Sequence, residues 1–301
     1  MDMKKVIVLG VNFNDEQRRR LEKVAELKYA ASPESAEEFL KSVEGFDVIC
    51  SDGSYLLENL PKLKNVFVTY PYIELGAFNS EKLKKNGVLV ANTQGSSRDT
   101  IAEWVIFMIL SLLRKFIPLV RVSESPEFQL NESLVDKKVL IVGKGNIGMR
   151  IGELCEVFKM QVDYFVRGDD LLTKASDADL VVNSLNSNSS TKNLLDEKFF
   201  MAMKHDSYFI SCVRHYTFDL GGLIRAIDTG VVSGAAIDTD PEEVFDASND
   251  FYKKALSNEK ILVTPHVAFS SKLASANGRE FAVENIETYL AGKSKRVLTK
   301  I

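Results

Sequence analysis

The chain has 301 residues, of which 45% are hydrophobic and 27% are charged, and its formal net charge is −4. This length predicts two domains, each able to bury a core of its own. The composition is typical of a globular protein. The mild negative charge argues against nucleic acid or an anionic membrane surface as a partner, since both repel acidic proteins.

The first 92 residues alternate between short apolar runs rich in β-branched residues and helical patterns. Strands are expected at 6–10, 46–50, 65–70 and 88–92, and helices at 15–27 and 80–87. This alternation favours a parallel sheet covered by helices.

A different pattern follows between Asp99 and Lys115, where the chain is apolar almost all round the predicted helix. Asp99 is placed to cap its start. The run is too short for a membrane span and contains Glu103. A helix this apolar must be buried, either between two domains or against a second subunit.

A polar stretch at 121–138 leads into a second series of strands and helices. It opens with VLIVGKGNIG at 139–148, and a last helix is expected at 272–290. The further strands are expected at 162–166, 178–185, 206–213, 232–238 and 260–265. The predicted fold class is α/β, with a Rossmann-type parallel sheet in this part and a second, flavodoxin-like α/β domain.

A glycine loop directly follows the strand at 139–142. Gly143, Gly145 and Gly148 would allow a tight turn, close approach of a pyrophosphate, and close packing of the next helix on the strand. Asn146 and Ile147 lie at the helix N-terminus, where an anion is held. The loop predicts a dinucleotide site; a methyltransferase, or a Rossmann domain that binds no cofactor, remains an alternative.

The end of the next strand bears on the choice of cofactor. An acidic residue there usually binds the ribose hydroxyls of NAD, but this chain has Val166 followed by Arg167. Because a guanidinium grips phosphate with two hydrogen bonds, we expect NADP(H), with NAD(H) possible. Alternatively, Arg167 is only solvated, and one of three nearby acids binds the ribose: Asp163, Asp169 or Asp170.

Three later segments carry the remaining polar pattern: FISCVRHYTFD, GAAIDTDPEEVFD and VTPHVAF. Arg214 is followed after 24, 29 and 52 residues by Asp238, Glu243 and His266. Read with the glycine loop and with LVANTQGSSRDTIAEW at 89–104, this pattern resembles the D-isomer-specific 2-hydroxyacid dehydrogenases. That family includes D-lactate, D-glycerate, hydroxypyruvate and phosphoglycerate dehydrogenases.

The resemblance implies a role for each matched residue. Arg214 would bind the carboxylate and carbonyl of a 2-oxo acid, and His266 would donate a proton to the carbonyl oxygen. Glu243 would orient that ring and raise its pKa. Asp238 matches the position that meets the nicotinamide end of the cofactor. The other cofactor contacts expected on this basis are Thr93, Cys212, Val213 and Ala268.

Each of these residues also has a plainer interpretation. A lone arginine after a strand is usually a surface residue, DPEE is usually a charged turn, and a histidine after a proline is usually structural. Cys212 is better explained as a small buried filler than as a contact, and His215 replaces the glycine usual after the family's arginine. The joint spacing favours the catalytic interpretation.

The sequence departs from the family at 70–74, where small residues usually present backbone N–H groups to the substrate carboxylate. Here the segment reads YPYIE, so Pro71 removes a donor and two tyrosines add bulk. We expect Tyr72 and Ile73 to contact the substrate. Either a tyrosine hydroxyl replaces the lost donor, or the loop packs differently and keeps its N–H groups.

These patterns predict a discontinuous substrate domain at 1–94 and 272–301 and a cofactor domain at 95–271, with substrate bound in the cleft between them. The resemblance implies an oxidoreductase that interconverts a small 2-oxo acid and its D-2-hydroxy acid, with glyoxylate, hydroxypyruvate or glycerate as the expected substrates. It also implies a homodimer joined through the apolar helix at 99–115. A nicotinamide-binding regulator with the same fold is the alternative.

The cysteines and the N-terminus bear on location. Cys50, Cys155 and Cys212 stand far apart with no C-x-x-C pair, which favours free thiols in a reducing compartment over a disulfide framework. The first apolar run is too short for the hydrophobic part of a signal peptide. A cytoplasmic protein is therefore expected. No metal site is predicted.

Overall fold

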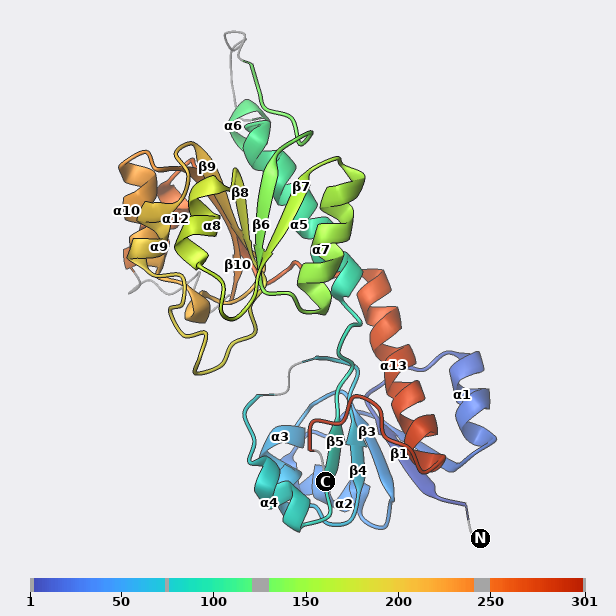
Figure 1. Cartoon of the computed structure of the whole chain (residues 1–301). Coiled ribbons are helices and arrows are strands. Elements are labelled where there is room, and N and C mark those ends of the chain that lie inside the picture. Colours follow the sequence, from blue (N-terminus) through green and yellow to red (C-terminus); the bar gives the residue numbers. More distant parts are fainter. Residues whose placement is uncertain (1–2, 74–75, 121–129, 241–249, 300–301) are drawn as a thin grey trace. The chain divides into compact units, whose positions relative to one another are not determined.

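The computed structural model describes residues 3–73, 76–120, 130–240 and 250–299. The chain divides into two compact units, the first made of Met1–Ser97 with Ser271–Ile301 and the second of Arg98–Ser270. Each unit contains a parallel sheet with helices on both faces, which confirms the predicted α/β class (Figure 1).

The first unit has the strand order β2-β1-β3-β4-β5, which is the flavodoxin-like order and confirms that prediction. Its strands are β1 (Lys5–Leu9), β2 (Glu26–Ala30), β3 (Val48–Ser51), β4 (Phe67–Thr69) and β5 (Leu89–Ala91). Its helices are α1 (Asp15–Glu22), α2 (Ala36–Val43), α3 (Leu56–Asn59), η1 (Leu60–Lys62), α4 (Ser80–Lys85) and α13 (Lys272–Leu290).

Alternate residues along β1 serve the two faces of this sheet. Val6 and Val8 pack in one hydrophobic cluster with α1 and α13, and Ile7 and Leu9 in another with α2, α3 and α4. The helix predicted at 15–27 ends earlier, at Glu22, and β2 takes up its last part. β2 lies at the sheet edge with an alternating, half-exposed pattern, so its charged residues resemble a continuation of the helix.

The second unit has the order β11-β10-β9-β8-β6-β7, which reverses direction between β6 and β8. Its strands are β6 (Lys138–Val142), β7 (Gln161–Phe165), β8 (Leu180–Asn183), β9 (Ser207–Ser211), β10 (Val232–Thr239) and β11 (Ile261–Pro265). Its helices are α5 (Arg98–Leu113), α6 (Phe116–Val120), α7 (Asn146–Val157), α8 (Leu171–Asp177), α9 (Glu197–Ala202), η2 (His215–Thr217), α10 (Leu220–Asp228) and α12 (Asp250–Ser257).

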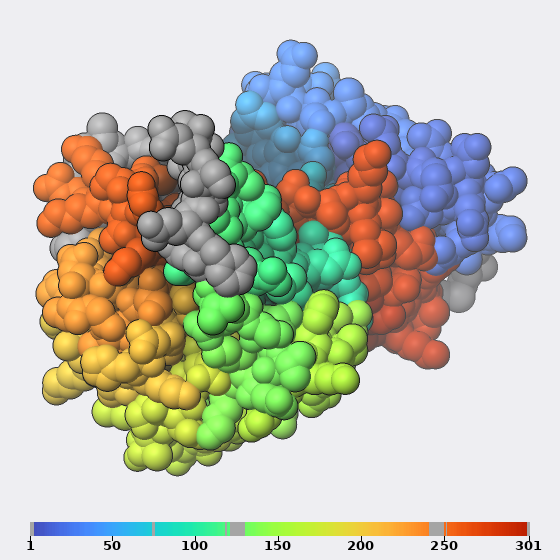
Figure 2. Space-filling view, turned by 90° about the horizontal axis from the view of Figure 1, so that it is seen from above, coloured from blue at the N-terminus to red at the C-terminus, as the bar shows by residue number. Residues whose placement is uncertain are grey.

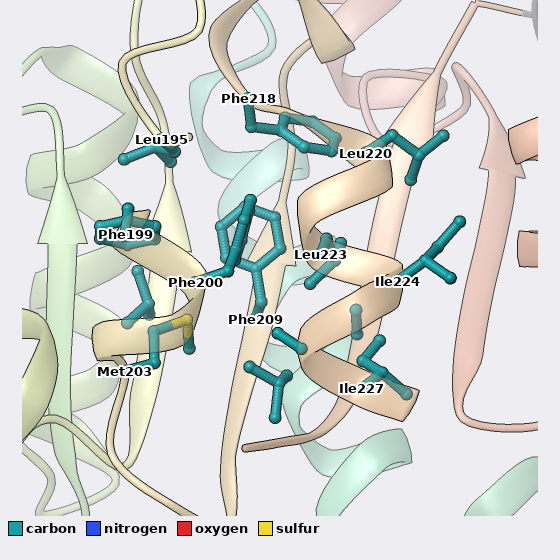
Figure 3. Close-up of a cluster of buried hydrophobic side chains, with 14 of the residues drawn as sticks. Leu195, Phe199, Phe200, Met203, Phe209, Phe218, Leu220, Leu223, Ile224 and Ile227 are labelled. Carbon is teal, nitrogen blue, oxygen red and sulfur yellow. The ribbon is translucent and has the colours of Figure 1, made fainter. Parts of the chain in front are cut away.

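Helices α8, α9, α10 and α12 cover one face of the second sheet. Figure 3 shows the centre of this layer, where Phe200 lies among aromatic rings from the sheet and the following loop. Its ring meets those of Phe199, Phe209 and Phe218 edge to face, with centroids 5.3, 5.0 and 6.4 Å away. This geometry is the favoured one for aromatic pairs, so it fixes α9 on the sheet.

Helix α5 covers the other face together with α7 (Figure 1). It begins at Arg98, so Asp99 lies inside its first turn and does not cap it; the Asp99 carboxylate instead accepts a hydrogen bond of 2.6 Å from Arg150 of α7. Most apolar residues of α5 are buried against its own sheet. The space-filling view shows the segments of this unit, from green to orange, closely packed together (Figure 2). Among the described residues, no helix is long and apolar enough to span a membrane.

Candidate functional site

The glycine loop lies at the point where the strand order of the second sheet reverses. Gly143 follows β6 with φ +113°, a conformation that glycine tolerates best, and a β-carbon there would meet the carbonyl oxygen of Ser184 at 2.8 Å. A β-carbon on Gly148 would lie 2.0 Å from the carbonyl oxygen of Gly143. These two glycines are therefore required by the protein's own backbone.

Gly145 differs, because a β-carbon there would meet nothing within 4 Å. It is the N-cap of α7, and no side chain caps this helix, whereas side chains cap α8, α9 and α13. Among the described residues, no side chain therefore satisfies the first N–H groups of α7, and the space beside Gly145 is open. This arrangement fits the pyrophosphate of a dinucleotide, which binds free N–H groups at a helix N-terminus. Asn146 is exposed beside it, and Ile147 packs partly into the core.

An exposed arginine follows the end of β7. Arg167 is exposed, and its Nη2 lies 3.3 Å from Oγ of Ser190, in the loop after β8. The three alternative acids have protein partners: Asp163 and Asp169 pair with Lys174 at 2.8 and 3.4 Å, and Asp170 caps α8. Ser190 was not predicted, and only the juxtaposition of two distant loops reveals it.

Arg214 lies just beyond the carboxyl end of β9, where a buried polar network holds its backbone. Asn183, at the end of β8, donates hydrogen bonds to the hydroxyls of Ser211 and Thr217, at 3.2 and 2.8 Å. These hydroxyls in turn donate to the carbonyls of Val213 and Arg214, at 2.9 and 3.4 Å. Since Asn183, Ser211 and Thr217 are fully buried, the network fixes the turn that carries the arginine.

The side chain of Arg214 has an ionic partner that sequence analysis did not single out. Its Nε lies 2.8 Å from Oδ2 of Asp240, the residue that follows β10. The neighbouring His215 packs edge to face on Tyr252, with ring centroids 6.2 Å apart. His215 is thus engaged with α12.

Asp238 organises the turn that carries His266. Its carboxylate is 2% exposed and accepts three hydrogen bonds, from the hydroxyl of Thr264 at 2.6 Å and from the N–H groups of Val267 and Ala268 at 2.8 and 2.9 Å. Nδ1 of His266 lies 4.0 Å from the same carboxylate. His266 has φ +51°, a left-handed conformation uncommon for residues other than glycine and sustained here by the bonded turn.

The remaining predicted cofactor residues are also placed. Cys212 is 8% exposed, its thiol donates to the carbonyl of Asn183, and burial raises the pKa of this thiol to about 12. Val213 is half-buried, and the N–H of Ala268 is already bound to Asp238. Thr93 lies in the first unit, fully buried, and its N–H donates to the carbonyl of Tyr72. Glu243 lies outside the described residues.

The unusual segment at 70–73 is anchored through its carbonyls. Thr93 N–H binds the carbonyl of Tyr72 at 3.1 Å, and the Asn92 amide binds that of Ile73 at 2.8 Å. In a trans peptide the N–H of Ile73 points opposite to the carbonyl of Tyr72, hence away from Thr93. The Tyr70 side chain is buried and its hydroxyl lies 3.4 Å from the Ile73 carbonyl, whereas the Tyr72 side chain is 52% exposed.

Comparison with known proteins adds independent information. Residues 106–268 match the family described as "D-isomer specific 2-hydroxyacid dehydrogenase, NAD binding domain". The chain is 26% identical to a D-lactate dehydrogenase of Staphylococcus aureus over 225 residues, 66% of this chain and 68% of the relative. It is 24% identical to the glycerate dehydrogenase of Methylorubrum extorquens over 314 aligned positions, 98% of this chain and 99% of the relative.

A solved structure shows the same fold. D-2-hydroxyisocaproate dehydrogenase superposes with a TM-score of 0.80 at 19% identity, covering 98% of this chain and all of that structure. The likeness extends over both units of the chain.

Proposed function

The chain belongs to the D-isomer-specific 2-hydroxyacid dehydrogenase family and is an oxidoreductase with a nicotinamide-binding domain, and we propose that its substrates are small 2-oxo acids of the glyoxylate and hydroxypyruvate type. The observation that supports this most is that Arg214 and His266 each follow a strand at the same edge of one sheet, in turns that buried polar groups hold. The glycerate dehydrogenase similarity, which spans nearly the whole chain, favours a glycerate or hydroxypyruvate substrate.

Each polar group has a defined task in the proposed reaction. Arg214 binds the substrate's carboxylate and stabilises the negative charge that grows on the carbonyl oxygen. Nδ1 of His266 faces Asp238, so the proton is delivered from Nε2. When bound, the nicotinamide cofactor supplies the hydride. In the oxidative direction His266 takes the proton back.

The proposed binding residues extend beyond this pair. The loop Gly143–Gly148 and the N-terminus of α7 hold the pyrophosphate, with Asn146 and Ile147 at its start. Val213, Cys212, Asp238, Ala268 and Thr93 are assigned to the remainder of the cofactor. Ile73 N–H is proposed to bind the substrate carboxylate, with Tyr72 beside it, and Glu243 to orient His266.

The direct experiment follows nicotinamide absorbance with glyoxylate, hydroxypyruvate, pyruvate and larger 2-oxo acids, each with NADPH and with NADH. We expect turnover of at least one short 2-oxo acid and formation of the D-hydroxy acid. Tight cofactor binding without turnover of any of these acids would instead support a nicotinamide-binding regulator.

We propose NADP(H) as the preferred cofactor. Arg167 and Ser190 together offer a guanidinium and a hydroxyl to a 2′-phosphate, while the nearby acids are occupied by Lys174 and by the α8 cap. Arg167→Ala should raise KM for NADPH about tenfold and leave KM for NADH unchanged. Arg225→Ala, which removes another exposed arginine of this unit, is the matched control. A preference for NADH that survives Arg167→Ala would overturn the assignment.

We also propose a homodimer and a cytoplasmic location. The exposed side chains of Phe107, Phe116 and Val120 form an apolar surface on α5 and α6, with the two rings 6.5 Å apart. A surface of this kind supports contact with a second copy. Sedimentation at micromolar concentration should show a dimer, and Phe107→Asp should shift it towards monomer; a monomeric unmodified protein would contradict this. The three buried free cysteines support a reducing compartment.

A further inference from the structure

Arg214, Asp240 and His266 follow three adjacent parallel strands in matching register. Ile237 of β10 lies opposite Ser211 of β9, and Thr239 of β10 lies opposite Pro265 of β11. Arg214 comes three residues after Ser211, and Asp240 comes three residues after Ile237. In the same way, Asp240 comes one residue after Thr239, and His266 comes one residue after Pro265. Because neighbouring strands run about 4.8 Å apart, this register places Asp240, at the end of the middle strand, between the positions of the two proposed catalytic residues.

An ion pair supports this placement on the side of Arg214. Oδ2 of Asp240 lies 2.8 Å from Nε of Arg214, and its side chain is 20% exposed, against 40% for the arginine. Behind Asp240, the buried hydroxyls of Thr239 and Tyr252 are hydrogen-bonded at 3.1 Å, which ties the end of β10 to α12. The carboxylate is therefore attached to a fixed backbone.

We propose that Asp240 is a positioning residue: its carboxylate holds the guanidinium of Arg214 through Nε and sets the direction in which it meets the substrate's carboxylate. The inference rests on the proposed function, in which Arg214 binds the substrate. An arginine side chain has many rotamers, and the buried network under Arg214 restrains only its backbone. An anion 2.8 Å from Nε restrains the far end of the side chain.

The experiment compares kcat and KM for the best 2-oxo acid at saturating cofactor, together with the Kd for NADPH. The variants are Asp240→Ala, Asp240→Asn, Arg214→Ala and the double variant Arg214→Ala/Asp240→Ala. Asp240→Asn keeps the size of the side chain and an oxygen beside Nε but removes the charge. Glu197→Gln is the matched control, because it removes a carboxylate that pairs with the exposed Arg225 on the same unit.

A misdirected guanidinium should raise KM about 10- to 100-fold in Asp240→Ala, with a smaller rise in Asp240→Asn. NADPH binding should stay within about twofold of the unmodified protein, since a change confined to one arginine leaves the glycine loop intact. In the Arg214→Ala background, loss of Asp240 should cost nothing further, because the carboxylate acts through the arginine.

Several outcomes would overturn the inference. An unchanged KM in Asp240→Ala would show that Arg214 needs no such support, and a lower KM would show that Asp240 competes with the substrate. An equal loss with and without Arg214 would show an independent effect. If Arg214→Ala abolishes turnover but Asp240→Ala does not raise KM, only the inference fails; if the unmodified protein turns over no 2-oxo acid, the proposed function fails and the inference with it.

Discussion

The turns β1–α1 and β6–α7 start alike and end differently. Both follow a buried strand, VIVL at 6–9 and VLIV at 139–142, and both place a glycine with positive φ directly after it. In the first turn Asn14 and Gln17 form a capping box, so the chain itself satisfies the N-terminus of α1. In the second turn Gly145 leaves the N-terminus of α7 without a side-chain cap.

This difference teaches where a ligand is to be expected. The apolar strand pattern predicts the same βα unit twice, but side chains of the described residues cap only the first of the two helices. An uncapped helix beside a glycine whose β-carbon would meet open space is therefore a better indicator of a dinucleotide site than the glycine spacing alone.

The largest effect is expected for Gly148→Ala, which would break the second turn. The added β-carbon would lie 2.0 Å from the carbonyl oxygen of Gly143 and 2.7 Å from Oγ of Ser184, so the loop must shift. We expect NADPH affinity to fall more than about 100-fold. The second unit should also lose about 1–3 kcal/mol of stability. A fluorescence titration that finds the Kd within threefold of the unmodified protein would contradict this.

Gly145→Ala should separate ligand binding from folding. Its β-carbon meets no protein atom within 4 Å, so the only expected loss of stability is that of a poorer N-cap residue, below about 1 kcal/mol. The added methyl group occupies the space next to the N–H groups of α7, so NADPH affinity should fall about tenfold, or about 1.4 kcal/mol. Calorimetry and titration of the same preparation check both statements; a lower thermal midpoint with unchanged affinity would reverse the interpretation.

Asn14→Ala is the counterpart in the first turn. Loss of the hydrogen bond from Gln17 N–H to the Asn14 side chain, 2.9 Å long, should cost about 1 kcal/mol of stability. The Kd for NADPH should be unchanged, because this cap belongs to the first unit. Denaturant unfolding measures the first effect, and any loss of cofactor affinity would show that the two turns are not independent.

The smallest effect concerns how stability depends on pH, through the contacts of Gln17 and Arg20 on α1 with Glu280 on α13. Burial alone would raise the pKa of Glu280, but hydrogen bonds from Gln17 and Arg20 outweigh it and hold the pKa below its ordinary value. A lowered carboxyl pKa stabilises the fold above the unfolded pKa, about 4.3, and this stabilisation is lost as pH falls through the folded value. Because the Arg20 and Glu280 side chains are each about a third exposed, this stabilisation should not exceed about 1 kcal/mol.

The thermal midpoint of the unmodified protein should therefore drop between about pH 5 and pH 3, and Arg20→Ala should drop less. Arg19→Ala on the same helix is the control. In the described structure, Arg19 Nε donates a hydrogen bond to a backbone carbonyl and not to a carboxylate. Identical pH profiles for Arg20→Ala and the unmodified protein would exclude this contribution.

Much of the fold is local in origin and was predictable. The buried strands of both sheets and the helix at 272–290 follow from apolar periodicity. β2 was missed because an exposed edge strand with alternating charges lacks a strong apolar signal, and the start of α5 was misplaced because the Asp99 side chain binds Arg150 of another helix. Such contacts join residues far apart in the chain and cannot be deduced from local patterns.

The site shows the same division. Residue type and spacing identify Gly145, Arg214 and His266 as candidates. The role of Asp238 in bonding the turn around His266, and the position of Asp240 beside Arg214, depend on the register of three strands. Register is set by packing across the whole sheet, so these residues can be assigned only once the fold is known.

The most direct test of the account is the rate of NADPH oxidation with hydroxypyruvate or glyoxylate, measured for the unmodified protein and for His266→Gln. We expect turnover by the unmodified protein and a loss of about 10²- to 10⁴-fold in kcat for the variant, with NADPH still bound at its original affinity. Equal rates for the two proteins would contradict the assignment of His266 as the proton donor.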